Sequence, residues 1–166
     1  MRTRSVEIIP GTGLPVAQVG QTLTDIEAVV GLADDIQADP DRAYWHRHVP
    51  AFVAHFDRDG VVELVEAYYS QGDQEQVTLG GVQLTFRLMD DVVADLEAAG
   101  MHARRMDIGF DFDEGFSVWS MSSLSTADLT GGSYDPDDER LVVEGVAVGA
   151  PSYFQDPARP STDPVQ

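Results

Sequence analysis

The sequence contains no cysteine, and this absence excludes several kinds of chemistry at once. No disulfide can form, and no thiolate can act as a nucleophile or as a metal ligand. The 166-residue chain has a hydrophobic fraction of 43%, which is sufficient for one apolar core. Since disulfides are characteristic of oxidising compartments, their absence favours a cytoplasmic protein.

Lysine is also absent, so all ten basic residues are arginine, against 29 Asp and Glu and a formal net charge of −19. Schiff-base chemistry is thereby excluded, and the glycine-rich stretch at 10–13 lacks the lysine of a phosphate-binding loop. A strongly negative chain repels nucleic acid and anionic lipid, so we expect neither nucleic acid nor membrane as a partner. A basic protein is the partner that this charge permits, and solubility alone is the alternative explanation.

Long apolar runs are missing as well. No stretch approaches the roughly 20 residues that a membrane-spanning helix needs, and the first residues lack the apolar segment of a signal peptide. We expect a single α+β domain over residues 1–150. Residues 151–166 contain four prolines, and we expect them to form a flexible tail.

Two short helices are predicted from their end signals. Over residues 24–31, Thr24 has the spacing of an N-cap whose partner is Glu27, and a glycine follows. Over residues 90–99, Asp90 is the expected cap, and again a glycine follows. The apolar residues recur at helical spacing, and both helices are too short to be stable unless they pack on a sheet.

Strands account for the remaining apolar segments. Asp57–Gly60 separates two β-branched and aromatic runs, which predicts a hairpin over 52–69. Apolar and acidic residues alternate over 106–112, which predicts a strand with one apolar and one acidic face, and 114–121 is expected to pair back on it. A last strand is expected over 141–148. Hairpins outnumber helices, so we predict an α+β fold in which an antiparallel sheet carries two short helices on one face.

The order of a helix followed by a hairpin occurs twice. "DIEAVVG" followed by "FDRDGVVEL" is similar to "DLEAAG" followed by "FDEGFSVW". Two diverged copies of one unit would explain this similarity. Chance similarity among common helix and turn residues is the alternative.

The stretch "GQTLTDIEAVVG" carries Gly20, Thr22, Ile26 and Gly31 at a spacing that resembles a helix phrase of the β-lactamase inhibitory protein family. A related phrase occurs in the small lipoprotein module of the outer-membrane assembly machinery. The resemblance implies a helical segment followed by antiparallel strands, present twice in the inhibitors, and a sheet that serves as a binding surface. The resemblance does not identify any residue of this chain as a contact to a partner. We interpret the glycines and threonines of this stretch as helix start and stop residues.

Aromatic and acidic residues are the candidates for binding. Tyr44 and Trp45 lie beside Arg47 in a predicted loop, and Trp119 is out of phase with its apolar neighbours, which predicts that it faces outward. Tyrosine, tryptophan and arginine are the residue types that anchor protein interfaces, and the alternative for Trp119 is that it covers an edge of the core. The predicted binding residues are Tyr44, Trp45, Arg47, Asp107, Asp111, Asp113 and Trp119.

Histidines are the candidates for metal binding. His46 and His48 are two residues apart, as are His55 and Asp57, and on an extended chain each pair projects from one face. Such a set suits zinc or iron, although Pro50 separates the two pairs. The alternative is two histidines in an exposed loop and one on the outer side of a strand.

The sequence offers little support for an enzyme. No Gly-x-Ser-x-Gly elbow is present, and the acidic stretches at 57–60, 111–114 and 135–139 do not follow the spacing of a calcium loop. We therefore predict a non-enzymatic acidic protein-binding module without a cofactor, such as an inhibitor or immunity protein for a basic partner. The alternative is a metal-binding protein or metal-dependent enzyme that uses the histidine set.

Overall fold

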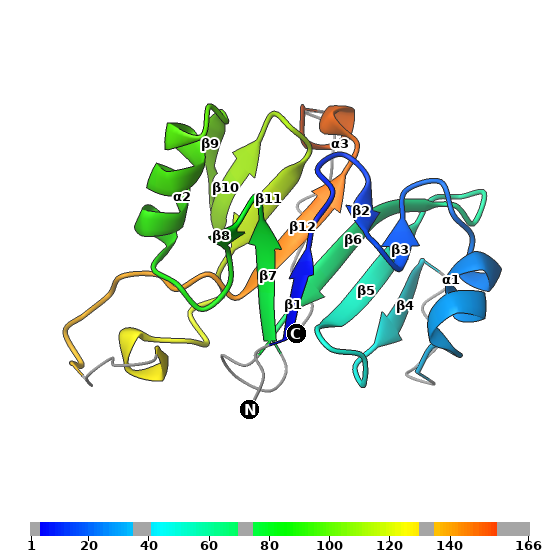
Figure 1. Ribbon diagram of the computed structural model, residues 1–166, viewed down its shortest axis with the longest axis horizontal. Helices are drawn as coiled ribbons and strands as arrows, with labels where there is room; N and C mark the ends of the chain where they lie inside the picture. The colour runs from blue at the N-terminus through cyan, green and yellow to red at the C-terminus, as the bar shows by residue number, and fades with distance from the viewer. Residues whose placement is uncertain (1–3, 35–40, 70–74, 130–134, 156–166) are drawn as a thin grey trace.

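The computed structural model describes residues 4–34, 41–69, 75–129 and 135–155. Its largest element is a seven-stranded sheet, in which all neighbouring strands are antiparallel (Figure 1). In spatial order the strands are β4 (Arg42–Trp45), β5 (Ala51–Phe56), β6 (Val62–Tyr68), β12 (Gly145–Gly149), β11 (Phe116–Trp119), β10 (Gly109–Phe112) and β9 (Ala103–Met106). The predicted α+β class with a large antiparallel sheet is confirmed.

Smaller elements cover one face of this sheet, which we call the first face (Figure 1). They are α1 (Leu23–Val30), α2 (Met89–Ala98), the hairpin of β2 (Gly13–Leu14) and β3 (Ala17–Gln18), and a sheet of β1 (Arg4–Glu7), β7 (Glu75–Leu79) and β8 (Val82–Gln83). The main core lies between them and the sheet. A 3₁₀ helix, η1 (Thr126–Asp128), follows β11, and none of the helices in the described ranges has the length and apolar character needed to cross a bilayer.

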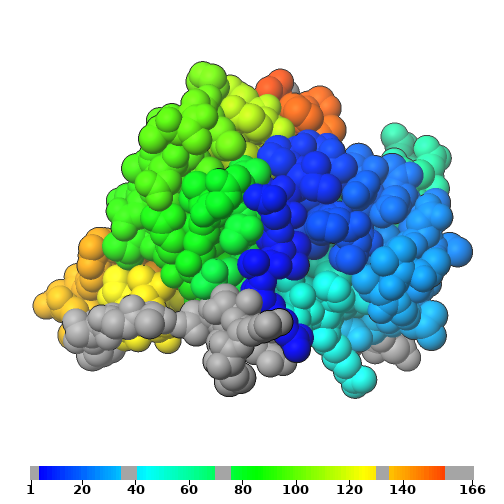
Figure 2. Space-filling model, in the orientation of Figure 1, coloured from blue at the N-terminus to red at the C-terminus, as the bar shows by residue number. Residues whose placement is uncertain are grey.

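The same order of elements occurs twice around the central strand. α1 precedes the meander β4–β5–β6, and α2 precedes the meander β9–β10–β11. β12 comes later in the chain and joins the two meanders by pairing with β6 on one side and β11 on the other. In the space-filling view, the N-terminal segment fills the front of the molecule between the two halves (Figure 2).

Both helices begin at residues other than those predicted. Thr22, not Thr24, caps α1, since its Oγ1 accepts from the backbone N of Asp25 and the Asp25 carboxylate accepts from the backbone N of Thr22. Thr22 is extended because it bridges Val61, and this pairing fixes where the helix begins. α2 begins at Met89, and its N-cap is Leu88 instead of Asp90.

The predicted strand over 106–112 is wrong as one element. A tight turn at residues 107–108 divides it into β9 and β10, which pair with each other. At the start of β10 the pairing with β11 requires a glycine at residue 109, because a Cβ there would lie 1.9 Å from the carbonyl oxygen of Val118. The strand β4 occupies part of the predicted loop around Tyr44.

The second face of the main sheet is also covered. Ala51, Val53, Leu64, Tyr68, Trp119 and Ala147 form a second buried cluster with Phe154 of α3 (Pro151–Gln155). The first five residues of the predicted flexible tail therefore form a helix, and residues 156–166 lie outside the described ranges. The expectation of a solvent-exposed acidic outer face is wrong at the centre of the sheet, because that face is buried there.

Candidate functional site

Both tryptophans are core residues and not surface anchors. Trp45 is 3% exposed, stacks on Phe52 with ring centroids 4.8 Å apart, and donates from Nε1 to the carbonyl oxygen of Gly31. Trp119 is 5% exposed, and its indole lies against Gly145, where a Cβ would come within 2.1 Å of the ring. The prediction that these side chains face a partner is therefore wrong, since cross-strand packing takes them inward.

The other predicted binding residues do not form one surface. Asp107 is exposed in the β9–β10 turn, and Asp113 is exposed beside Arg104, at 3.1 Å. Asp111 is 4% exposed, contrary to the expectation of an exposed acidic face, because β10 turns it towards the covered second face. Tyr44 is half-buried and Arg47 exposed, and both belong to the opposite end of the sheet.

The predicted metal ligands separate into different environments. His46 binds the hydroxyl of Tyr68 through Nδ1 and stacks on Tyr44. His48 meets the Phe52 ring edge-on, and its Nδ1 lies 3.0 Å from the carbonyl oxygen of Pro50. His55 is buried beside a glutamate of β6, and Asp57 accepts backbone hydrogen bonds within the β5–β6 turn. Among the described residues, no group of three His, Asp or Glu side chains is placed to hold a metal ion.

Burial raises the pKa of the Tyr68 phenol, and the negative charge of Asp34 adds to the effect. The phenol therefore stays protonated at neutral pH and binds His46 as a hydroxyl. Its environment opposes formation of a phenolate, so we assign Tyr68 a structural role.

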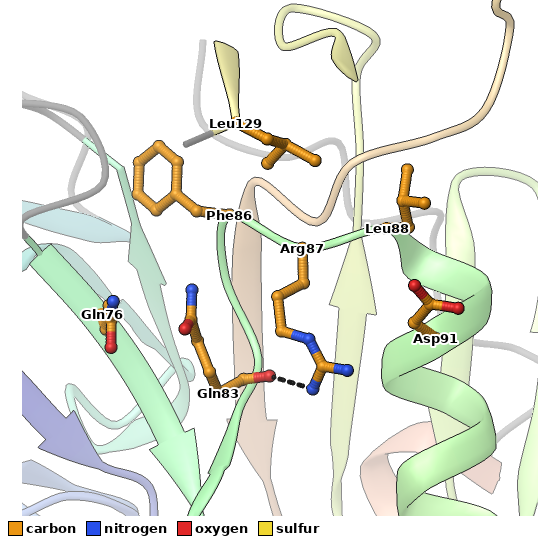
Figure 3. A pocket seen from close by; sticks show the side chains of 7 residues that line it. All are labelled: Gln76, Gln83, Phe86, Arg87, Leu88, Asp91 and Leu129. Carbon is orange, nitrogen blue, oxygen red and sulfur yellow. Dashed lines mark hydrogen bonds between the residues drawn. The ribbon is translucent and has the colours of Figure 1, made fainter. Parts of the chain in front are cut away.

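A hollow of about 490 Å³ lies where the segment after β8 enters α2 (Figure 3). This volume is within the range of about 300–1,000 Å³ that is typical of ligand pockets. Its lining combines two amide side chains, three apolar side chains, one arginine and one aspartate, which come from β7, residues 83–88, α2 and the residue after η1. The lining residues are Gln76, Gln83, Phe86, Arg87, Leu88, Asp91 and Leu129.

The backbone that builds this hollow has an unusual conformation. Phe86 has φ of +58°, a region that bulky side chains rarely adopt and that costs about 1–3 kcal/mol. Tertiary contacts hold it there, since its backbone N donates to the carbonyl oxygen of Val143 at 3.0 Å and its ring meets Tyr69 edge-on. The next residues also pair with the chain before β12, through a bridge between Leu88 and Val142. The wall of the hollow is therefore fixed.

The positive charge of the hollow is already neutralised. Arg87 donates to the carbonyl oxygen of Gln83 at 3.1 Å and to the Asp95 carboxylate at 2.8 Å. The side chain of Gln83 also has a defined orientation, because its Nε2 donates to the carbonyl oxygen of Thr85 at 2.8 Å. Its Oε1 atom and the exposed Asp91 carboxylate are then two acceptors at the hollow, and the amide of Gln76 also lies in its lining (Figure 3).

Beside the hollow, the fold brings together two acidic segments that are distant in the sequence. We define the acidic corner as the acids of α2 and of the loop before β12, namely Asp90, Asp91, Asp95, Glu97, Asp135, Asp137, Asp138 and Glu139. The two segments lie against each other because the backbone N of Met89 donates to the carbonyl oxygen of Leu141 (Figures 1 and 2). All of these acids except the half-buried Asp138 are exposed.

Two guanidinium groups lie within the acidic corner, and both already have partners. Arg87 is bound to Asp95, and Arg140 makes three contacts of 2.8–3.3 Å with Asp138. Hydrogen bonding to Arg140 lowers the pKa of Asp138, and the same contact raises the pKa of Arg140, with smaller effects from Asp91 and Asp135. The acidic corner therefore carries six more negative than positive charges.

Sequence reasoning missed the acidic corner and its hollow. "MDDVVADLE" and "DPDDER" are visible as acidic stretches, but they are about one quarter of the chain apart, and their contact depends on the pairing of residues 86–89 with 141–143. The chain matches no protein-family model, no curated protein and no solved structure.

Proposed function

We propose that the chain is a non-enzymatic protein-binding module whose acidic corner binds a basic protein, and that it acts as an inhibitor or immunity protein in the cytoplasm. The observation that carries this proposal is that two segments with eight carboxylates, α2 and the 135–139 loop, are brought together by backbone pairing next to them, while the two arginines present are already paired. A surface of this kind attracts a cationic partner and speeds its association.

The arrangement of the fold supports a binding role for this corner. Four of the carboxylates lie on α2. The loop that carries the other four runs into residues 141–143, whose backbone pairs with residues 86–89 at the start of α2. A preorganised surface loses less conformational entropy on binding than a mobile one. The family resemblance stated above is compatible with an inhibitor, and it supplies no contact for this corner.

Nona-arginine labelled with a fluorophore is a suitable probe, measured by fluorescence anisotropy over a range of salt concentrations. The variant D90N/E97Q/E139Q removes three charges from the acidic corner, and no residue in it lines the hollow. The control variant D59N/E63Q/D107N removes three exposed charges elsewhere. We expect the corner variant to bind about tenfold more weakly than the control, and affinity to fall with salt.

Equal losses in the two variants would show that the probe responds only to net charge, and the proposal would then be wrong. Affinity that does not change with salt would also contradict it, because exposed charges are screened at high ionic strength.

A further inference from the structure

The hollow beside Phe86 combines an apolar wall with a carboxylate at the edge of the acidic corner. Phe86, Leu88 and Leu129 provide the apolar part, and Asp91 lies at the first turn of α2 (Figure 3). A ligand that fits must therefore present an apolar section and a cationic group to the same hollow. Arginine and lysine side chains have this character, because a hydrocarbon stem carries their charge.

Asp91 is the acceptor that remains available. Among the described residues, none donates a hydrogen bond to its carboxylate, whereas Asp95 and Asp138 are each bound to an arginine. Arg87 is held by Gln83 and Asp95, so it is not free to neutralise Asp91. The charge of Asp91 also acts on the guanidinium of Arg140, which is bound to Asp138. The preference of the hollow for a cation therefore depends on the excess of carboxylates in the acidic corner.

Arginine fits this hollow better than lysine. Its planar guanidinium binds a carboxylate through two parallel hydrogen bonds. Gln83 Oε1 is a further acceptor in the lining because its Nε2 is bound to Thr85, and the Arg87 side chain lies between it and Asp91 (Figure 3). Lysine offers a single ammonium and cannot make this pair of parallel hydrogen bonds.

We propose that this hollow is an anchor pocket for an arginine side chain of the basic partner, with Asp91 as its carboxylate and Phe86, Leu88 and Leu129 as its apolar wall. This inference rests on the proposed function, and it specifies the partner residue that the acidic corner accepts. The fixed backbone at Phe86 keeps the pocket formed before the partner arrives.

The probe is Nα-acetyl-L-arginine N-methylamide, titrated against the ¹³C-labelled protein while the methyl signals of Leu88 and Leu129 are followed by NMR. We expect saturable shifts of these signals at about millimolar concentration and no shift at Leu23, which is exposed on α1. The citrulline analogue, which is neutral and nearly the same shape, is the ligand control. We expect it to bind at least about tenfold more weakly, since it lacks the charge that pairs with a carboxylate.

The protein controls are Asp91→Asn and Asp137→Asn. Both remove one exposed charge of the acidic corner, but Asp91 alone lines the hollow. We expect Asp91→Asn to abolish the shifts, and Asp137→Asn to leave them within about twofold of the original affinity. Equal binding of the citrulline analogue, or shifts that persist in Asp91→Asn, would overturn the proposal.

The two proposals fail in different ways. Binding of nona-arginine could depend on the acidic corner while the arginine compound leaves the methyl signals of Leu88 and Leu129 unshifted. This result would support a basic partner and would show that the anchor pocket is wrong. If the arginine compound binds the hollow but the corner variant binds nona-arginine as well as its control does, the corner is not the partner surface.

Discussion

His55 Nε2 and Glu66 Oε1 lie 2.8 Å apart on the buried second face of the main sheet, where the two residues are 7% and 1% exposed. They come from adjacent strands and are diagonal neighbours, since Glu66 is opposite Val53 and His55 is opposite Leu64. Neither atom makes a hydrogen bond of good geometry with the described residues, so each relies on the other in a region with little access to water. Such a pair is costly to break.

The first prediction concerns this pair. Removing one partner leaves the other polar group buried alone, so we expect His55→Leu and Glu66→Leu each to lower the free energy of unfolding by about 3–5 kcal/mol. The double variant should lose less than the sum of the two, because neither polar group remains. Urea unfolding measures all three, with the exposed Glu63→Leu on the same strand as the control. Additive losses would show that the two side chains do not interact.

The second prediction separates two candidate helix caps. Thr22→Ala removes the Oγ1 that accepts from the backbone N of Asp25, so we expect a loss of about 1 kcal/mol. Thr24→Ala is the matched control two residues along, and we expect less than about 0.5 kcal/mol, since Thr24 is exposed within the helix. Urea unfolding measures the free energy of unfolding of both variants, and a larger loss of stability in Thr24→Ala than in Thr22→Ala would contradict the observed cap.

The third prediction concerns the contact of Trp119 with Gly145. A Cβ at residue 145 would lie 2.1 Å from the indole, so Gly145→Ala must displace the ring or the strand. We expect a loss of about 1–3 kcal/mol by thermal or urea unfolding. The same substitution should be nearly neutral in a Trp119→Val background, where the ring is absent. A cost unchanged by the removal of Trp119 would mean that the strand itself excludes alanine.

The fourth prediction follows the Asp138 carboxyl, whose pKa is lowered chiefly by its hydrogen bond to Arg140. A lowered pKa stabilises the fold above the ordinary carboxyl pKa of about 4, and this contribution is lost as the pH falls through the folded value. We expect Arg140→Gln to move the NMR titration midpoint of Asp138 upward, towards its usual range. Arg105→Gln, at a distant arginine on β9, should not move it. An unchanged midpoint in Arg140→Gln would assign the shift to another cause.

The sequence predicts the fold class well, because periodicity and turn residues are local properties. Asp57–Gly60 forms the predicted β5–β6 turn, and α1 and α2 lie within a residue or two of their expected ranges. The errors occur where tertiary contacts override local signals. Thr22 caps α1 because it pairs with Val61. Residues 42–45 have the composition of a loop, and they form the strand β4 because they pair with β5.

The candidate site could not be predicted for a related reason. Alternation of polar and apolar residues distinguishes the two faces of a strand, but it does not reveal whether both faces are covered. Asp111 and Trp119 are buried on the face that was expected to meet solvent. The acidic corner depends on contact between Met89 and Leu141, which are far apart in the chain. The composition shows a large excess of acidic residues, and only the tertiary arrangement shows that α2 and the 135–139 loop bring two groups of them together.

The place of β12 has a consequence for the order of folding during synthesis. Residues 145–149 are synthesised after all the other strands of the described residues, yet they form the middle of the seven-stranded sheet. Until then, a nascent chain presents two separate meanders, each with an open strand edge at β6 or β11 that could pair with another chain. The seven-stranded sheet is complete only once this central strand has inserted, and a chain in which it has not yet done so is the form most prone to aggregation.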